Sequence, residues 1–183
     1  MDIFSQLNLS TDKFFQELNE SKEIIRTSWS YITGTLDAAL KGQDSKSLLA
    51  LIPYIEQGEG TPAYEHIGES RQILRILHIV RLELTYQKTP FFLHCADKDS
   101  LMEKYMLSLF ALRRLFFRLS EDSVKEAEDW LLRNKLSVFA IYVIIQEDFI
   151  FADNALYGKI AELCSAYWDD GDKQLFLSLT AGN

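Results

Sequence analysis

The sequence predicts an all-α protein: a single irregular bundle of seven or eight helices, with a stack of helical hairpins as the alternative arrangement. Only eight glycines and three prolines occur among 183 residues, so turn-forming residues are scarce. Residues 91–157 contain neither, and sheet proteins rarely extend that far without a turn residue. Apolar residues also recur at helical spacing. The pattern of TPR-type repeats is absent, which favours the irregular bundle.

The helices are expected between capping and turn residues. The first begins after the capping side chains at 10–12 and ends near Leu40, with a kink at Gly34 and Gly42 just beyond its end. Pro53 lies inside the second helix and predicts either a kink or an early end. After the first helix, the expected ranges are about 46–57, 63–88, 97–119, 121–135, 136–151, 153–168 and 172–179.

Residues 58–62, Gly-Glu-Gly-Thr-Pro, form the clearest loop and the one predicted hinge. The loop is too short to act as an interdomain linker. Residues 1–183 are therefore expected to form a single helical domain, which is near the usual domain size.

The segment 138–145 gives conflicting local signals. Its β-branched and aromatic residues suit a buried strand by intrinsic propensity. Helical patterns flank it on both sides, and no obvious partner strand exists elsewhere. We therefore predict a fully buried central helix.

The composition indicates which cellular compartment and which class of partner to expect. The formal net charge is −8, which argues against nucleic acid and against an anionic membrane surface. The longest apolar run, 138–145, is too short to span a bilayer. Cys95 and Cys164 lie far apart, and no signal peptide is visible after Met1. Free thiols in the cytoplasm are expected.

Charge is unevenly distributed along the chain. Residues 71–118 carry nine basic and four acidic side chains, a net charge of +5 inside an acidic protein. Ion pairs with the acidic helices across the bundle would explain this basic segment, although each exposed pair contributes little. The alternative is a docking face for an acidic partner or an anionic ligand.

An anion site is one candidate on this segment. Arg71, Arg75 and His78 share a face of the third long helix, because residues four and seven positions apart lie on one side. Two guanidiniums and an imidazole suit a phosphate or a carboxylate. The simpler alternative is a solvated helix face, and no glycine-rich phosphate loop accompanies these residues.

A partner-binding surface is the second candidate. Phenylalanines 110, 116 and 117 alternate with Arg113, Arg114 and Arg118, a mixture found in single-strand nucleic-acid binders. On a helix, we expect the phenylalanines in the core and the arginines at a wet rim. Trp168 is either core or an exposed anchor for a partner, because tryptophan dominates interface hot spots.

The sequence gives little support for a catalytic site, a metal site or a calcium-binding loop. The adjacent His94 and Cys95 suggest a buried connector with an inert thiol, and no zinc spacing or Glu-x-x-His motif occurs. Glu147 either needs a buried partner or marks a helix's exit to solvent. The acidic run 169–172 lacks the alternation of a calcium loop and indicates a helix N-cap. No metal and no cofactor is expected.

The sequence therefore predicts a non-catalytic helical protein–protein interaction module, binding another protein or a second copy of itself. The alternative is a small-ligand sensor or enzyme with an anion pocket between helices, lined by Arg71, Arg75 and His78.

Overall fold

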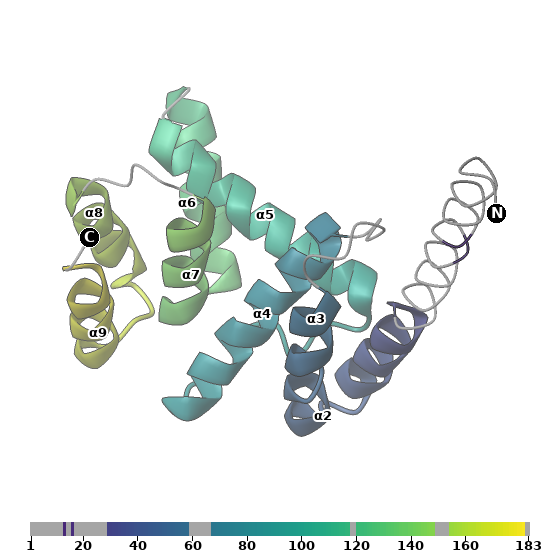
Figure 1. Cartoon of the computed structure of the whole chain (residues 1–183). Helices are drawn as coiled ribbons and strands as arrows, with labels where there is room; N and C mark the ends of the chain where they lie inside the picture. The colour runs from purple at the N-terminus through teal and green to yellow at the C-terminus, as the bar shows by residue number, and fades with distance from the viewer. Residues whose placement is uncertain are drawn as a thin grey trace.

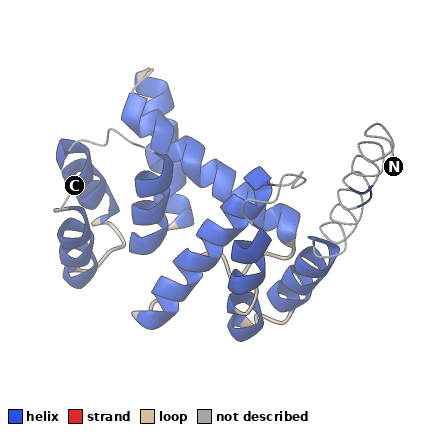
Figure 2. Cartoon of the chain, viewed as in Figure 1, coloured by secondary structure: helices blue, strands red, loops and turns tan. Residues whose placement is uncertain are grey.

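A computed structural model describes residues 13, 16, 29–58, 67–117, 120–148 and 154–181. Within these residues every regular element is a helix and no strand occurs (Figure 2), which confirms the all-α prediction. Residues 29–41 are helical, and eight further helices follow: Ser45–Leu49 (α2), Ile52–Gly58 (α3), Ile67–Thr85 (α4), Lys98–Phe117 (α5), Glu121–Asn134 (α6), Val138–Asp148 (α7), Asn154–Cys164 (α8) and Asp170–Thr180 (α9).

Helix α4 lies at the centre of the arrangement. It packs against α2, α3, α5 and α7, while α7 also contacts α5 and α9 (Figure 1). Helix α6 packs along α5 and touches α8, and α8 pairs with α9. No single layer or repeat describes these contacts, so the arrangement is an irregular multi-helix bundle, as predicted.

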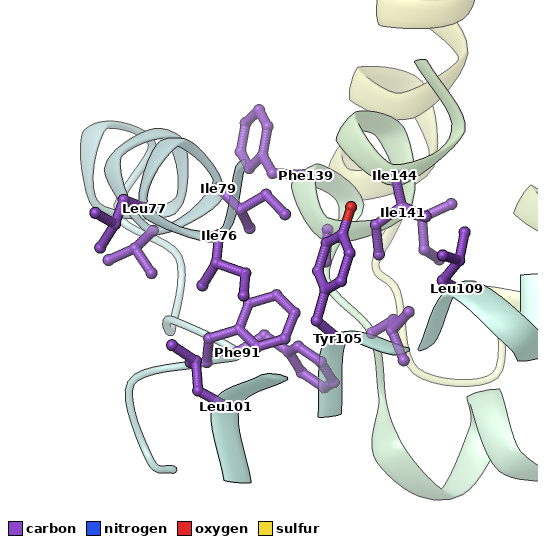
Figure 3. Packing of buried hydrophobic residues seen from close by; sticks show 14 of the residues in the cluster. Ile76, Leu77, Ile79, Phe91, Leu101, Tyr105, Leu109, Phe139, Ile141 and Ile144 are labelled. Atoms are coloured by element: carbon purple, nitrogen blue, oxygen red, sulfur yellow. The ribbon is translucent and has the colours of Figure 1, made fainter. Parts of the chain in front are cut away.

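The core forms where α4, α5 and α7 meet (Figure 3). Ile76 and Ile79 of α4 face Tyr105 of α5, and Phe139 and Ile141 of α7 complete the cluster. The segment 138–145 is therefore a helix and not a strand. It tolerates apolar residues on most of its circumference because α4, α5 and α9 all pack against it.

The predicted second helix is divided into α2 and α3. Pro53 has no backbone N–H, and its ring would clash with the carbonyl group four residues earlier, at Leu49. The α-helix ends there, and the Leu51 N–H donates to the Leu48 carbonyl oxygen (3.1 Å) in a tighter turn. Of the two outcomes expected for Pro53, the early end is the one that occurs.

Several helix ends differ from the predicted ones. Left-handed backbone follows three helices at residues other than glycine: Gln43 (φ 50°), Gln87 (φ 56°) and Lys135 (φ 53°). Helix α4 consequently ends at Thr85, before the predicted stop at 89–90, because the chain reverses at Gln87. The N-cap predicted in the run 169–172 is present, and a second aspartate caps α2. Asp44 and Asp169 accept the backbone N–H groups of Ser47 (3.1 Å) and Asp172 (2.7 Å).

Parts of the sequence-based interpretation lie outside the described residues. The capping residues 10–12, most of the first half of the first helix and the hinge beyond Gly58 belong to these parts. Among the helices that are described, none is both long enough and apolar enough to cross a membrane.

The left-handed residue Lys135 yields a stability prediction. A residue with a Cβ atom lowers the free energy of unfolding by about 1 kcal/mol when its backbone is left-handed, and glycine avoids this loss. Lys135 is exposed, and its N–H bond to Leu131 (2.8 Å) does not involve the side chain. We expect Lys135→Gly to raise the melting temperature by about 2–4 °C in calorimetry.

Lys135→Ala is the matched control, because it removes the same charge but keeps the Cβ atom. An equal gain from alanine and glycine would show that the lysine charge, and not the backbone conformation, is destabilising.

Candidate functional site

An open groove of about 800 Å³ runs between α5 and α6. Apolar side chains form most of its lining, and charged side chains of both signs stand at its edges. The lining residues are Leu107, Phe110, Ala111, Arg114, Glu126, Ala127, Asp129, Trp130, Leu132 and Arg133. Two small residues, Ala111 and Ala127, are buried at its floor, which leaves room above them for a side chain from another molecule.

Large apolar side chains project from the outer face of α5 beside this groove. Leu107 is 43% exposed, Phe110 44% and Phe117 66%. With Arg114 between them, the spacing of three, four and three residues places all four on one helical stripe. We call Leu107, Phe110, Arg114 and Phe117 the α5 stripe. It holds half of the large apolar residues that are exposed in the described part of the chain.

The α5 stripe exists because α5 carries more apolar side chains than one face can bury. The inner face, with Tyr105, Leu109 and Leu112, is filled by contacts with α4 and α7. The remaining apolar residues are left on the opposite side, next to α6. The expectation that Phe110 and Phe117 belong to the core is therefore wrong, although Phe116 is partly buried.

Charged groups balance one another around the groove. Arg113 and Arg114 are exposed, as expected of a wet rim, and Arg114 Nη1 lies 3.6 Å from Glu126 Oε2. Both partners are well exposed, so the pair contributes roughly 0–1 kcal/mol. The third arginine of this group, Arg118, lies outside the described residues.

Trp168 is not on the surface. It is 6% exposed, its Nε1 donates to the Leu136 carbonyl oxygen (3.1 Å), and its ring centroid lies 5.2 Å from that of Phe176. Of the two roles considered for Trp168, the core role fits this burial. An anchor for a partner would need an exposed indole ring, which Trp168 does not have.

The residues of the predicted anion-binding site lie along α4, but two of them already have a carboxylate beside them. Arg75 Nε is 3.7 Å from Glu147 Oε2, and His78 Nε2 is 3.8 Å from Glu56 Oε1. Burial, followed by the charge of Arg81, lowers the pKa of His78, so the imidazole carries less positive charge at neutral pH. Arg71 is exposed on the same helix.

These pairs also bear on the basic segment 71–118. Arg75, Lys88 and Lys98 contact acidic groups outside the segment, with Lys88 Nζ 2.5 Å from Asp172 Oδ1 and Lys98 Nζ 2.9 Å from Glu69 Oε1. Ion pairs across the bundle therefore account for part of the local excess of positive charge.

Among the described residues the buried carboxylate is Glu83, and of the two roles considered for Glu147 the exit of a helix to solvent is the one that fits. Glu83 is fully buried in α4, whereas Glu147 is 53% exposed near the end of α7. A signal for Glu83 was present in the sequence. It follows Ile79 and Val80 by four and three residues, which places it on the buried stripe of its helix.

Glu83 has a hydrogen-bond partner at each oxygen. The Ser137 hydroxyl donates to Oε1, and the Phe91 N–H donates to Oε2 (3.1 Å). Burial raises the pKa of Glu83 to about 7, although both hydrogen bonds and the charge of Lys104 oppose that rise. Lys104 Nζ donates to the Phe91 carbonyl oxygen (2.7 Å) and lies 3.9 Å from the centre of the Phe91 ring.

Glu83 and Phe91 are both buried in this cluster. The nearby Cys95 is buried, and burial raises the pKa of its thiol, which disfavours the reactive thiolate. Neither the α5–α6 groove nor a second hollow of about 670 Å³ between α6 and α8 includes Glu83 in its lining. Neither of these two hollows therefore gives a small molecule access to the Glu83 carboxyl group.

Among the described residues, no three His, Cys, Asp or Glu side chains are placed so that they could hold a metal ion together. Within the acidic run 169–172, Asp169 caps α9 and Asp172 pairs with Lys88.

Comparison with known proteins gave no match: no family model, no curated protein and no solved structure is significantly similar to this chain.

The raised pKa of Glu83 predicts a pH-dependent stability. Because the folded protein holds this proton up to about pH 7 and the unfolded chain releases it near the ordinary value of 4.5, stability is lost as the pH rises through this window. Glu83→Gln keeps one acceptor and one donor but cannot ionise. We expect the variant to gain about 2–3 kcal/mol relative to the wild type between pH 5 and pH 8 in urea unfolding.

Glu147→Gln is the control, because it removes an exposed carboxylate, together with its ion pair to Arg75, from the neighbouring helix. Its stability difference from the wild type should stay constant across this range. A pH-independent difference between Glu83→Gln and the wild type would contradict the prediction.

Proposed function

We propose that the chain is a non-catalytic protein–protein interaction module that binds its partner through the α5 stripe and the α5–α6 groove. The observation that carries this proposal is the exposure of Leu107, Phe110 and Phe117 on one stripe of a helix whose opposite face is buried. Adjacent apolar side chains with a charged rim are a common feature of interaction sites.

The composition of this surface suits a protein partner. Aromatic and aliphatic side chains at the centre, with arginines and carboxylates at the edge, resemble the organisation of protein interfaces. Trp130 and Phe110 line the groove from α6 and α5, and aromatic residues of this kind dominate binding energies. A groove between two helices also fits the apolar face of a third helix.

The anion-binding alternative has weaker support. Arg75 and His78 have carboxylates within 4 Å, so an incoming anion would have to displace Glu147 and Glu56. Nucleic acid is a poor candidate for the α5–α6 groove, because Glu126 and Asp129 stand there beside the arginines. The cytoplasm is the compartment that we propose, since Cys95 and Cys164 are buried and unpaired.

Site-specific photo-crosslinking tests the proposal even though the partner is unidentified. A photoreactive phenylalanine, p-benzoylphenylalanine, replaces Phe110 or Phe117 in the cells that naturally express the chain, and adducts are detected by their mass. We expect protein adducts at both positions. Leu177, 43% exposed on α9, is the control position and should give few adducts. Equal labelling at all three positions, or none at the α5 positions, would refute the proposed surface.

A further inference from the structure

We infer that a second copy of this chain covers the α5 stripe, with the two α5 helices packed antiparallel about a two-fold axis level with Leu112. This inference rests on the proposed function and names its partner. It follows from the symmetry of the stripe, from the chemistry of the paired side chains and from the charge balance of the groove.

The spacing of the α5 stripe is the same in both directions. Leu107, Phe110, Arg114 and Phe117 are separated by three, four and three residues, and their midpoint is at residue 112. A two-fold axis at that level brings position 107 opposite 117 and position 110 opposite 114 of the second copy. An interface between identical chains must be self-complementary in this manner.

The facing side chains are chemically compatible. Leu107 would pack on Phe117 of the second copy, and the 43% and 66% exposures of these residues supply apolar area to bury. Phe110 would face Arg114 of the second copy, a pairing in which the guanidinium lies over an aromatic ring. Each contact occurs twice, so all four exposed positions of the stripe receive a partner.

The groove leaves space for this approach. Its floor is formed by Ala111, adjacent to the proposed axis, and by Ala127 of α6. These methyl groups are small enough to admit a neighbouring helix at the usual packing distance of about 8–10 Å. The two α5–α6 pairs would then form a four-helix arrangement of the kind found in helical bundles.

Charge balance favours a second copy over a strongly charged partner. The lining holds Arg114 and Arg133 against Glu126 and Asp129, so the groove is neutral although the chain carries a net charge of −8. A neutral surface gives no particular attraction for a highly acidic or highly basic protein. Two chains of charge −8 repel at long range, so added salt should strengthen the pairing.

Sedimentation velocity of the purified full chain over micromolar concentrations tests the association. We expect a monomer–dimer equilibrium that shifts toward dimer as salt increases. Phe110→Lys places a cation opposite Arg114 of the second copy and should weaken the dimer by at least about 30-fold, the loss typical of a central interface residue. Leu177→Lys, on α9, is the matched control and should leave the equilibrium unchanged. Monomeric wild-type protein throughout this range, or equal effects of the two variants, overturns the inference.

Disulfide trapping tests the register and does not depend on the stability of Phe110→Lys. Proteins carrying Leu107→Cys and Phe117→Cys are mixed and oxidised, and a crosslinked heterodimer is expected. Each protein alone should crosslink poorly, because positions 107 of two copies would be about 15 Å apart along the helices. That separation exceeds the Cα distance of about 7 Å that a disulfide can span. Equal crosslinking of single and mixed samples overturns the antiparallel register.

The two proposals fail separately. A monomeric wild-type chain whose photo-crosslinks at Phe117 contain a different protein would refute self-association and retain the interaction module. Absence of any adduct at the α5 positions would refute both.

Discussion

The Glu83 carboxyl group joins three segments that are distant in the sequence, and the position of α7 depends on it. Its oxygens accept from the Phe91 N–H and the Ser137 hydroxyl, and the Ser137 oxygen in turn accepts the Ala140 N–H (3.1 Å) in the first turn of α7. Lys104 of α5 adds a bond to the Phe91 carbonyl oxygen. Leaving such buried groups without partners would cost about 1–3 kcal/mol each, so this network restricts how α4, α5 and α7 can pack.

The exposed surface of α5 follows from that restriction. Helices α4 and α7 occupy the inner face of α5, where Tyr105 and Leu109 lie in the core (Figure 3). The stripe from Leu107 to Phe117 is on the opposite side of the helix and is therefore left exposed. Helix α6 covers one flank of the stripe and contributes Trp130 to the groove. The result is an exposed apolar surface, the proposed docking site, on a helix whose other side is packed in the core. A pre-organised surface loses less conformational entropy on binding than a flexible one.

Electrostatics distinguish the two surfaces that the sequence suggested. On α4, Arg75 and His78 lie beside Glu147 and Glu56, and burial lowers the pKa of the imidazole. These contacts join α4 to α7 and α3 and thereby serve the fold. On α5, the pair that Arg114 forms with Glu126 is exposed, and water screens it. Its guanidinium can therefore be directed to a partner at little cost.

The sequence by itself determined the helices, because capping and periodicity are local properties. Helices α5, α6 and α9 begin and end within two residues of their predicted limits, and Ser120 and Asp169 cap the latter two from positions next to them. It also drew attention to residues 110–118, although it placed the phenylalanines there in the core. Only the tertiary structure decided which apolar faces are covered. Periodicity shows that α5 has apolar residues on two sides, but the neighbours that bury Leu109 and leave Phe110 exposed come from α4 and α7. The burial of Trp168 and of Glu83 likewise depends on contacts with residues 136–137, more than thirty residues away along the chain.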